Sequence, residues 1–120
     1  MKISCESEVP VFTIHVGISD KNTYQQMVDT GVFAKMIQNV CGGYRVSYST
    51  HMQQGGYVHE NGDYIQELSA VIVLIGATRE TVNSVAADLC CFLNQETVLV
   101  ETHQSTYYSV SESIDFEGLT

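Results

Sequence analysis

A chain of 120 residues can bury a real hydrophobic core, and we expect a single domain over residues 1–120. The formal net charge of -9, from 5 Lys and Arg against 14 Asp and Glu, argues against nucleic-acid binding, which requires cations to neutralise phosphates. No apolar run approaches a membrane span, and the N-terminal MKISCESEVP lacks the apolar segment of a signal peptide, so we expect a cytoplasmic protein without a membrane partner.

The cysteines are Cys5, Cys41, Cys90 and Cys91. Their spacing matches neither a zinc site nor a redox pair, and two of them are adjacent on a predicted helix. We therefore expect buried, reduced thiols and no nucleophilic cysteine.

Residues 11–18 alternate between apolar and mixed positions, which predicts a strand with one apolar face. Ser19 or Asp20 is the expected cap of a following helix, which the pair Gly42 and Gly43 should end. The apolar stripe of that helix consists of Tyr24, Met27, Val28, Val32, Met36, Ile37 and Val40.

A second strand is expected over residues 44–51, followed by turn-like segments at 53–56 and 60–63. A third strand is expected over residues 64–75, and its uniformly apolar second half indicates burial on both faces. Thr78 should cap a second helix, with strands at 97–101 and 106–110 and an acidic, loosely ordered tail at 111–120. The expected stripe of the second helix is Val82, Val85, Ala86, Leu89, Phe92 and Leu93.

The predicted order β-α-β-β-α-β indicates an α+β, ferredoxin-like sandwich in which two helices cover one face of an antiparallel sheet. The other face is left open. Residues 70–75 are apolar at every position, so this open face should be apolar too. Because large exposed apolar patches are rare on monomers, we expect oligomerisation.

The stretch from residue 42 to residue 76 is a long polar hairpin that ends in the most hydrophobic strand, and we expect it to carry the site. Glu67 precedes the buried run, where partial burial would make it a strong hydrogen-bond acceptor or a base. An ordinary exposed glutamate is the alternative, just as Tyr57 could bind a ligand or merely cover the sheet.

The histidines raise the possibility of a metal site. His51, His59 and His103, with Glu60, could converge if the hairpin folded over the last strand. No pair among them has a recognised ligand spacing, so we predict neither a metal nor a cofactor.

Four segments give the chain a resemblance to the small bacteriophage S-adenosylmethionine (SAM) lyases, formerly described as SAM hydrolases. They are VFTIHVGIS, GGYRVSYSTHMQQGGY, the glutamate ten residues after Tyr57, and NSVAADLCCFLNQETVLVETHQSTYYSV. The similarity extends over the core at residues 9–110.

The resemblance implies a PII-like homotrimer with active sites between subunits. It implies that SAM is cleaved to 5′-methylthioadenosine and homoserine lactone, with Glu67 and Tyr57 at catalytic positions and His59, Gln95 and His103 as further substrate-binding positions. By family analogy the biological role is anti-restriction in a phage-infected cell.

Three alternatives stay open. The chain could be a SAM hydrolase that releases homoserine, or a non-catalytic trimer of the PII or CutA kind that senses or sequesters a nucleotide. It could also be an acidic inhibitor that mimics nucleic acid, although its acidic residues are dispersed along the sequence.

Overall fold

The structure is a computed structural model that describes residues 2–18, 29–95 and 97–112. The described elements are β1 (Lys2–Gly17), α1 (Thr30–Tyr44), β2 (Tyr48–Val58), β3 (Tyr64–Ile75), α2 (Arg79–Phe92) and β4 (Leu99–Ser111). No helix in the described ranges is long and apolar enough to cross a membrane.

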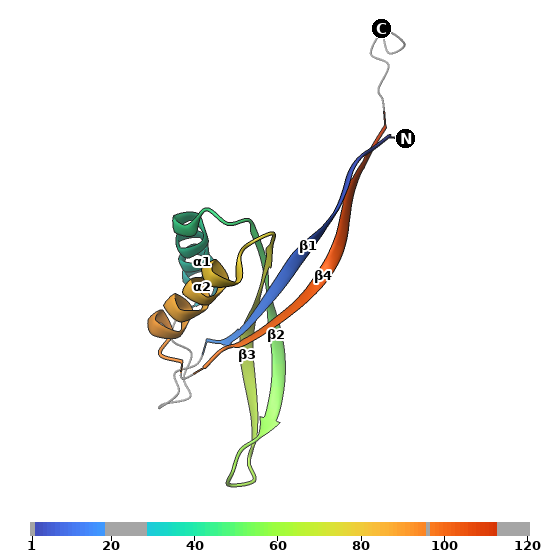
Figure 1. Ribbon diagram of the computed structural model, residues 1–120. Helices are drawn as coiled ribbons and strands as arrows, with labels where there is room; N and C mark the ends of the chain where they lie inside the picture. Colours follow the sequence, from blue (N-terminus) through green and yellow to red (C-terminus); the bar gives the residue numbers. More distant parts are fainter. Residues whose placement is uncertain (1, 19–28, 96, 113–120) are drawn as a thin grey trace, which may run out of the picture.

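The four strands form one sheet in the order β2-β3-β1-β4, and every neighbouring pair is antiparallel. Both helices lie on the same side of this sheet (Figure 1). This order and layering define the ferredoxin-like sandwich, so the predicted fold class is confirmed.

The core lies between the helices and the sheet face that they cover. As predicted, one face of β1 is buried, and alternate residues of β3 are buried beside it. The buried strand residues on this face are Phe12, Ile14, Val16, Ala70, Ile72 and Leu74. The helices contribute Phe33, Ile37, Val40, Cys41, Val82, Val85, Ala86 and Leu89.

The first helix differs from the prediction at both ends. Its N-cap is Asp29, whose carboxylate accepts from the backbone N–H of Val32 at 2.8 Å, while Ser19 and Asp20 lie outside the described residues. The helix also continues through the two glycines predicted to end it, as far as Tyr44. Arg45, with a φ of 56°, supplies the left-handed residue that closes it.

The second helix begins as predicted, because the Thr78 hydroxyl accepts from the backbone N–H of Thr81 at 3.1 Å. One residue of its predicted stripe is wrong. Phe92 is 54% exposed, because Leu89 and Leu93 occupy the buried side at the end of α2.

The hairpin between β2 and β3 is longer than predicted. Residues 53–56 were expected to turn, but they continue β2 and pair with residues 66–69 of β3. The chain reverses at Asn61 and Gly62, where the Gly62 N–H donates to the His59 carbonyl at 2.8 Å and Gly62 has a φ of 90°. The hairpin therefore extends beyond the end of β1 as a two-stranded ribbon (Figure 1).

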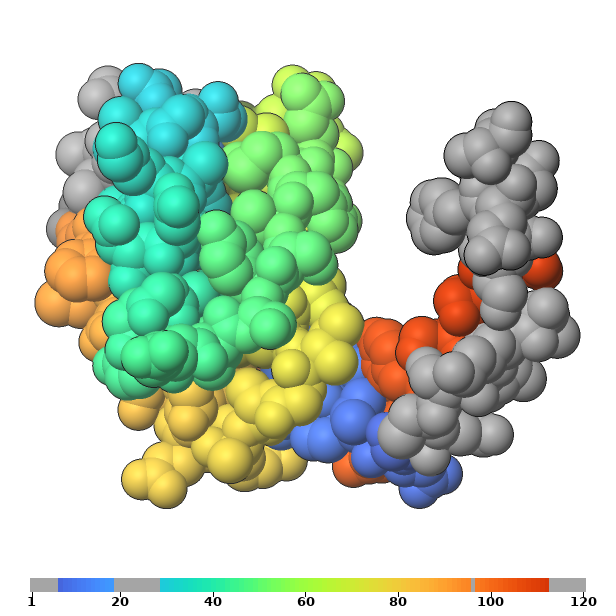
Figure 2. All heavy atoms as spheres, turned by 90° about the horizontal axis from the view of Figure 1, so that it is seen from above, coloured from blue at the N-terminus to red at the C-terminus, as the bar shows by residue number. Residues whose placement is uncertain are grey.

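A second ribbon projects from the opposite end of the sheet. β1 begins at Lys2, not near residue 11, and pairs with a single β4 in place of the two short strands predicted for this region. Beyond the pairing of Val11 with Ile75, β1 and β4 continue without β3. Figure 2 shows the red end of β4 standing away from β2 and β3. The radius of gyration is accordingly 18.8 Å, against about 14 Å for a compact chain of this length.

Candidate functional site

Glu67 and Tyr57 lie on the same face of the β2–β3 hairpin. Glu67 pairs with Gly55, and Tyr57 pairs with Ile65, one step further along the ladder. Paired residues share a face and alternate residues return to it, so Glu67 and Tyr57 are diagonal neighbours, with Cα atoms about 7–8 Å apart. Their face is the one that the helices leave open.

Glu67 lies where the sheet narrows from three strands to two. Ser69, two residues further along β3, pairs with Gly17, the last residue of β1. Because β1 ends there, no β1 residue pairs with Glu67. The Glu67 side chain is half-buried, which is one of the two possibilities that the sequence left open. Within the described ranges it makes no hydrogen bond or ion pair, so the structure presents a half-buried acceptor without a donor.

Gln95 brings a second acceptor oxygen to the same place. It follows α2, where its backbone N–H donates to the Cys90 carbonyl at 2.9 Å and its side-chain amide donates to the Leu93 carbonyl at 3.2 Å. Its Oε1 atom lies 3.3 Å from the point that a Cβ on Gly17 would occupy, and the Glu67 carboxylate adjoins the same point. The Glu67 carboxylate accepts hydrogen bonds only, so this place favours a ligand rich in N–H or O–H donors.

The two predicted histidines occupy different places. His59 is half-buried at the start of the hairpin turn, two residues beyond Tyr57, and its backbone N–H donates to the Asp63 carbonyl at 2.7 Å. His103 is exposed on β4 and pairs with Val11, which itself pairs with Ile75. Eight residues of β3 therefore separate it from Glu67, which is about 27 Å along the strand. A single chain does not bring His103 into the site.

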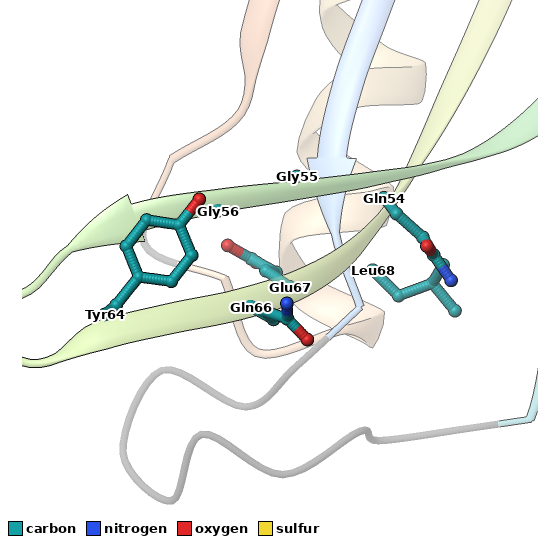
Figure 3. A pocket seen from close by; sticks show the side chains of 7 residues that line it. All are labelled: Gln54, Gly55, Gly56, Tyr64, Gln66, Glu67 and Leu68. Carbon is teal, nitrogen blue, oxygen red and sulfur yellow. The ribbon is translucent and has the colours of Figure 1, made fainter.

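A cavity of about 470 Å³ lies along the hairpin beside Glu67. Figure 3 shows the ring of Tyr64 standing against Gly56. Glu67, whose carboxylate lies over Gly17 of β1, also lines the cavity. Its other lining residues are Gln54, Gly55, Gln66 and Leu68. Gln54, Tyr64 and Gln66 alternate with Glu67 and Tyr57, so they point to the opposite face of the hairpin. Sequence reasoning missed them, although glycines inside a strand are a signal of close packing by a neighbour.

His15 and Glu101 were also missed. The His15 Nε2 atom contacts the Glu101 carboxylate across β1 and β4, on the open face of the sheet. His15 shares its row with Val71 and His51. The two partners are 86 residues apart in sequence, so only the strand register reveals the pair.

No three His, Cys, Asp or Glu side chains gather to hold a metal ion in the described part of the chain. Cys41, Cys90 and Cys91 are free thiols, and burial raises the pKa of the Cys41 thiol. Cys90 is half-buried, whereas Cys91 is exposed, so the prediction of burial is wrong for Cys91. The reason is that Cys91 lies on the solvent side of the last turn of α2, beside Phe92.

Solved structures share this fold. A phage SAM lyase in complex with S-methyl-5′-thioadenosine is 20% identical, with a TM-score of 0.63, and the match covers 89% of this chain and 93% of that one. The apo state of a phage SAM lyase is 21% identical, with a TM-score of 0.63 and coverage of 90% and 94%. CPII from Thiomonas intermedia K12, a nitrogen regulatory PII-like protein, is 13% identical in its apo form, with a TM-score of 0.53 and coverage of 91% and 100%.

No family model matches the sequence, and no curated protein matches it significantly. At these identities the likeness establishes architecture. The chain therefore has the ferredoxin-like, PII-like fold found in the phage SAM lyases, and the fold that the sequence resemblance implied is confirmed.

Proposed function

We propose that this protein is a SAM lyase that cleaves SAM to 5′-methylthioadenosine and homoserine lactone. The observation that carries the proposal is the half-buried Glu67 carboxylate, which has no partner among the described residues, next to Gln95 and on the face of Tyr57. The shared fold supports it, because a solved phage SAM lyase of this architecture binds methylthioadenosine.

For this reaction the protein needs to do little more than position the substrate and exclude water. The carboxylate of the methionine moiety attacks the γ-carbon, the C–S bond breaks, and its electron pair neutralises the sulfonium. Opposite charges cancel as the lactone forms, so the transition state is less polar than the substrate. A site that strips water from both groups therefore favours the reaction, and holding the folded methionine tail in an attack geometry contributes further.

In this reaction Glu67 accepts hydrogen bonds from the ribose hydroxyls or the ammonium group of SAM, and Gln95 beside it is a further substrate-binding position. Tyr57 orients the methionyl moiety or forms a wall of the substrate site on the open face. The net charge of -9 attracts a cationic substrate. His59 at the hairpin turn is a further substrate-binding position.

We also propose that the active unit is a homotrimer with sites between subunits. Glu67 and Tyr57 lie on the open sheet face, and His103 is about 27 Å away along the strand, so it reaches a site only from another subunit. The same face carries Ile75, which is 38% exposed, next to Val73. Two-stranded ribbons are marginally stable alone, and contact with neighbouring subunits would stabilise both ribbons.

The test is incubation with SAM, followed by mass spectrometry at short times. We expect methylthioadenosine together with homoserine lactone. Oxygen from ¹⁸O-labelled water in the earliest product would instead indicate the hydrolase, with Glu67 as a general base. Binding of SAM without turnover would favour the alternative, a non-catalytic PII-like binder.

The matched variants are Glu67→Gln and Glu80→Gln, which remove the same charge. Glu80 is exposed in the first turn of α2, on the far side of the sheet. We expect Glu67→Gln to lose most turnover with the trimer intact, and Glu80→Gln to keep it. Near-normal turnover of Glu67→Gln would refute the role of this residue.

Depletion of SAM would starve methylation and SAM-dependent restriction in a host cell, which is the proposed anti-restriction role. Expression in a bacterium should then leave its DNA undermethylated, and expression of Glu67→Gln should not.

A further inference from the structure

Gly17, the last residue of β1, has no conformational reason to be glycine. Among the described glycines, positive φ angles occur at Gly62 and Gly76, and Gly17 has an ordinary strand backbone. A glycine inside a strand weakens the sheet, because it has no side chain to pack. The reason for Gly17 must therefore lie in the space around it.

That space is occupied by Glu67. A Cβ built on Gly17 would overlap the Oε1 atom of Glu67 and would lie 3.3 Å from both Glu67 Cδ and Gln95 Oε1. The carboxylate thus lies over the backbone of β1, where any other residue would place its side chain. Gly55 makes the contrast: it pairs with Glu67 directly, yet a Cβ built there meets nothing within 4 Å.

We propose that Gly17 is a positioning residue, which lets the Glu67 carboxylate lie down on the sheet beside Gln95. This inference rests on the proposed function, since it assigns the position of that reaction's principal acceptor. Gln95 is held by its bonds to the carbonyls of Cys90 and Leu93, so it cannot readily follow a displaced carboxylate. Glu67 is flexible, so an added methyl group moves the carboxylate and leaves the strand in place.

A displacement of about 1 Å at a catalytic group can reduce turnover by about 100-fold. For Gly17→Ala we therefore expect kcat for methylthioadenosine formation from SAM to fall about 10- to 100-fold. The melting temperature should be unchanged or slightly raised, because alanine suits a strand better than glycine does. Gly42→Ala, the control in α1 on the far side of the sheet, where a Cβ also meets nothing within 4 Å, should keep wild-type kcat and KM.

A second measurement separates positioning from structure. In a Glu67→Ala background no carboxylate remains to be displaced, so adding Gly17→Ala should cause no further loss of turnover, measured at high enzyme concentration over long incubations. Equal losses of turnover in both backgrounds would overturn the inference. A fall in the melting temperature of Gly17→Ala by more than about 10 °C would also overturn it, because so large a fall exceeds the effect of a local rearrangement.

The inference and the proposed function fail in different ways. A wild-type protein that forms no methylthioadenosine refutes the proposed function. An active wild-type protein whose Gly17→Ala variant keeps full activity refutes the positioning role and leaves the proposed function standing.

Discussion

Val73 offers a direct test of the proposed trimer. It lies in the middle of β3 on the open face, paired with Thr13 of β1 on one side and Ser49 of β2 on the other. Its side chain is half-buried in the single chain. The perturbation is Val73→Glu, which places one carboxylate per subunit on the face that the trimer would cover.

The size of the effect follows from desolvation. An unpaired carboxylate removed from water costs several kcal/mol even after relaxation, and each 1.4 kcal/mol weakens an association about tenfold. Three copies near one axis repel one another as well. In the free subunit the Glu side chain reaches water, so the cost to folding should be about 1 kcal/mol.

Size-exclusion chromatography with light scattering provides the assay, and circular dichroism reports folding. We expect three chain masses for the wild type and one for Val73→Glu, with the fold retained. Ala87→Glu, at an exposed position of α2, makes the same change in charge and should remain trimeric. A Val73→Glu trimer as stable as the wild type would show that this face is not the interface.

Three further predictions concern local contacts. Iodoacetamide should modify exposed Cys91 well before buried Cys41, whose raised pKa disfavours the thiolate, as followed by mass spectrometry. Gly56→Ala would put a methyl group 2.5 Å from the Tyr64 hydroxyl oxygen, so the ring should swing away at a cost of up to about 1 kcal/mol, measured by thermal denaturation. Thr78→Ala should lose about 1 kcal/mol of stability with the cap of α2, measured by urea denaturation.

The parts of the fold that sequence predicted well depend on local chemistry. β3 matches its predicted bounds at Tyr64 and Ile75, because a turn precedes it and an apolar run completes it. Thr78 caps α2 as predicted, because a cap is recognised within four residues. The order of strands and helices then follows from these periodic segments.

The wrong boundaries depend on contacts between distant segments. Gly55 and Gly56 predict a turn locally, but their pairing with Gln66 and Glu67 keeps them in β2. The start of β1 was missed because its first residues are held by β4, about a hundred residues later in the sequence. Local propensity carries no information on either pairing.

The candidate site, like the fold, could be predicted from the sequence only in part. Glu67 and Tyr57 were singled out by resemblance, and the register of the hairpin places them on one face. Gly17 could not be found from sequence, because its significance arises from a side chain fifty residues away that occupies the space over its Cα atom.

Glu67 should also lower the free energy of unfolding. This effect distinguishes a functional carboxylate from a structural one, which would raise it. It is half-buried and has no partner within the described ranges, so folding removes part of its hydration without a compensating bond. Glu67→Gln keeps the shape and relieves that cost, and we expect the melting temperature to stay level or rise by a few degrees, equivalent to at most about 1 kcal/mol.

Differential scanning calorimetry without SAM, on wild type, Glu67→Gln and the Glu80→Gln control, measures this directly. A residue that organises the hairpin would behave in the opposite way, and a fall of several degrees for Glu67→Gln alone would assign Glu67 to the fold. If Glu67→Gln keeps its stability and loses its turnover, the result has one physical explanation. The carboxylate is then retained because a ligand donates hydrogen bonds to it. Binding of that ligand recovers the free energy that desolvation of the carboxylate costs the unliganded protein.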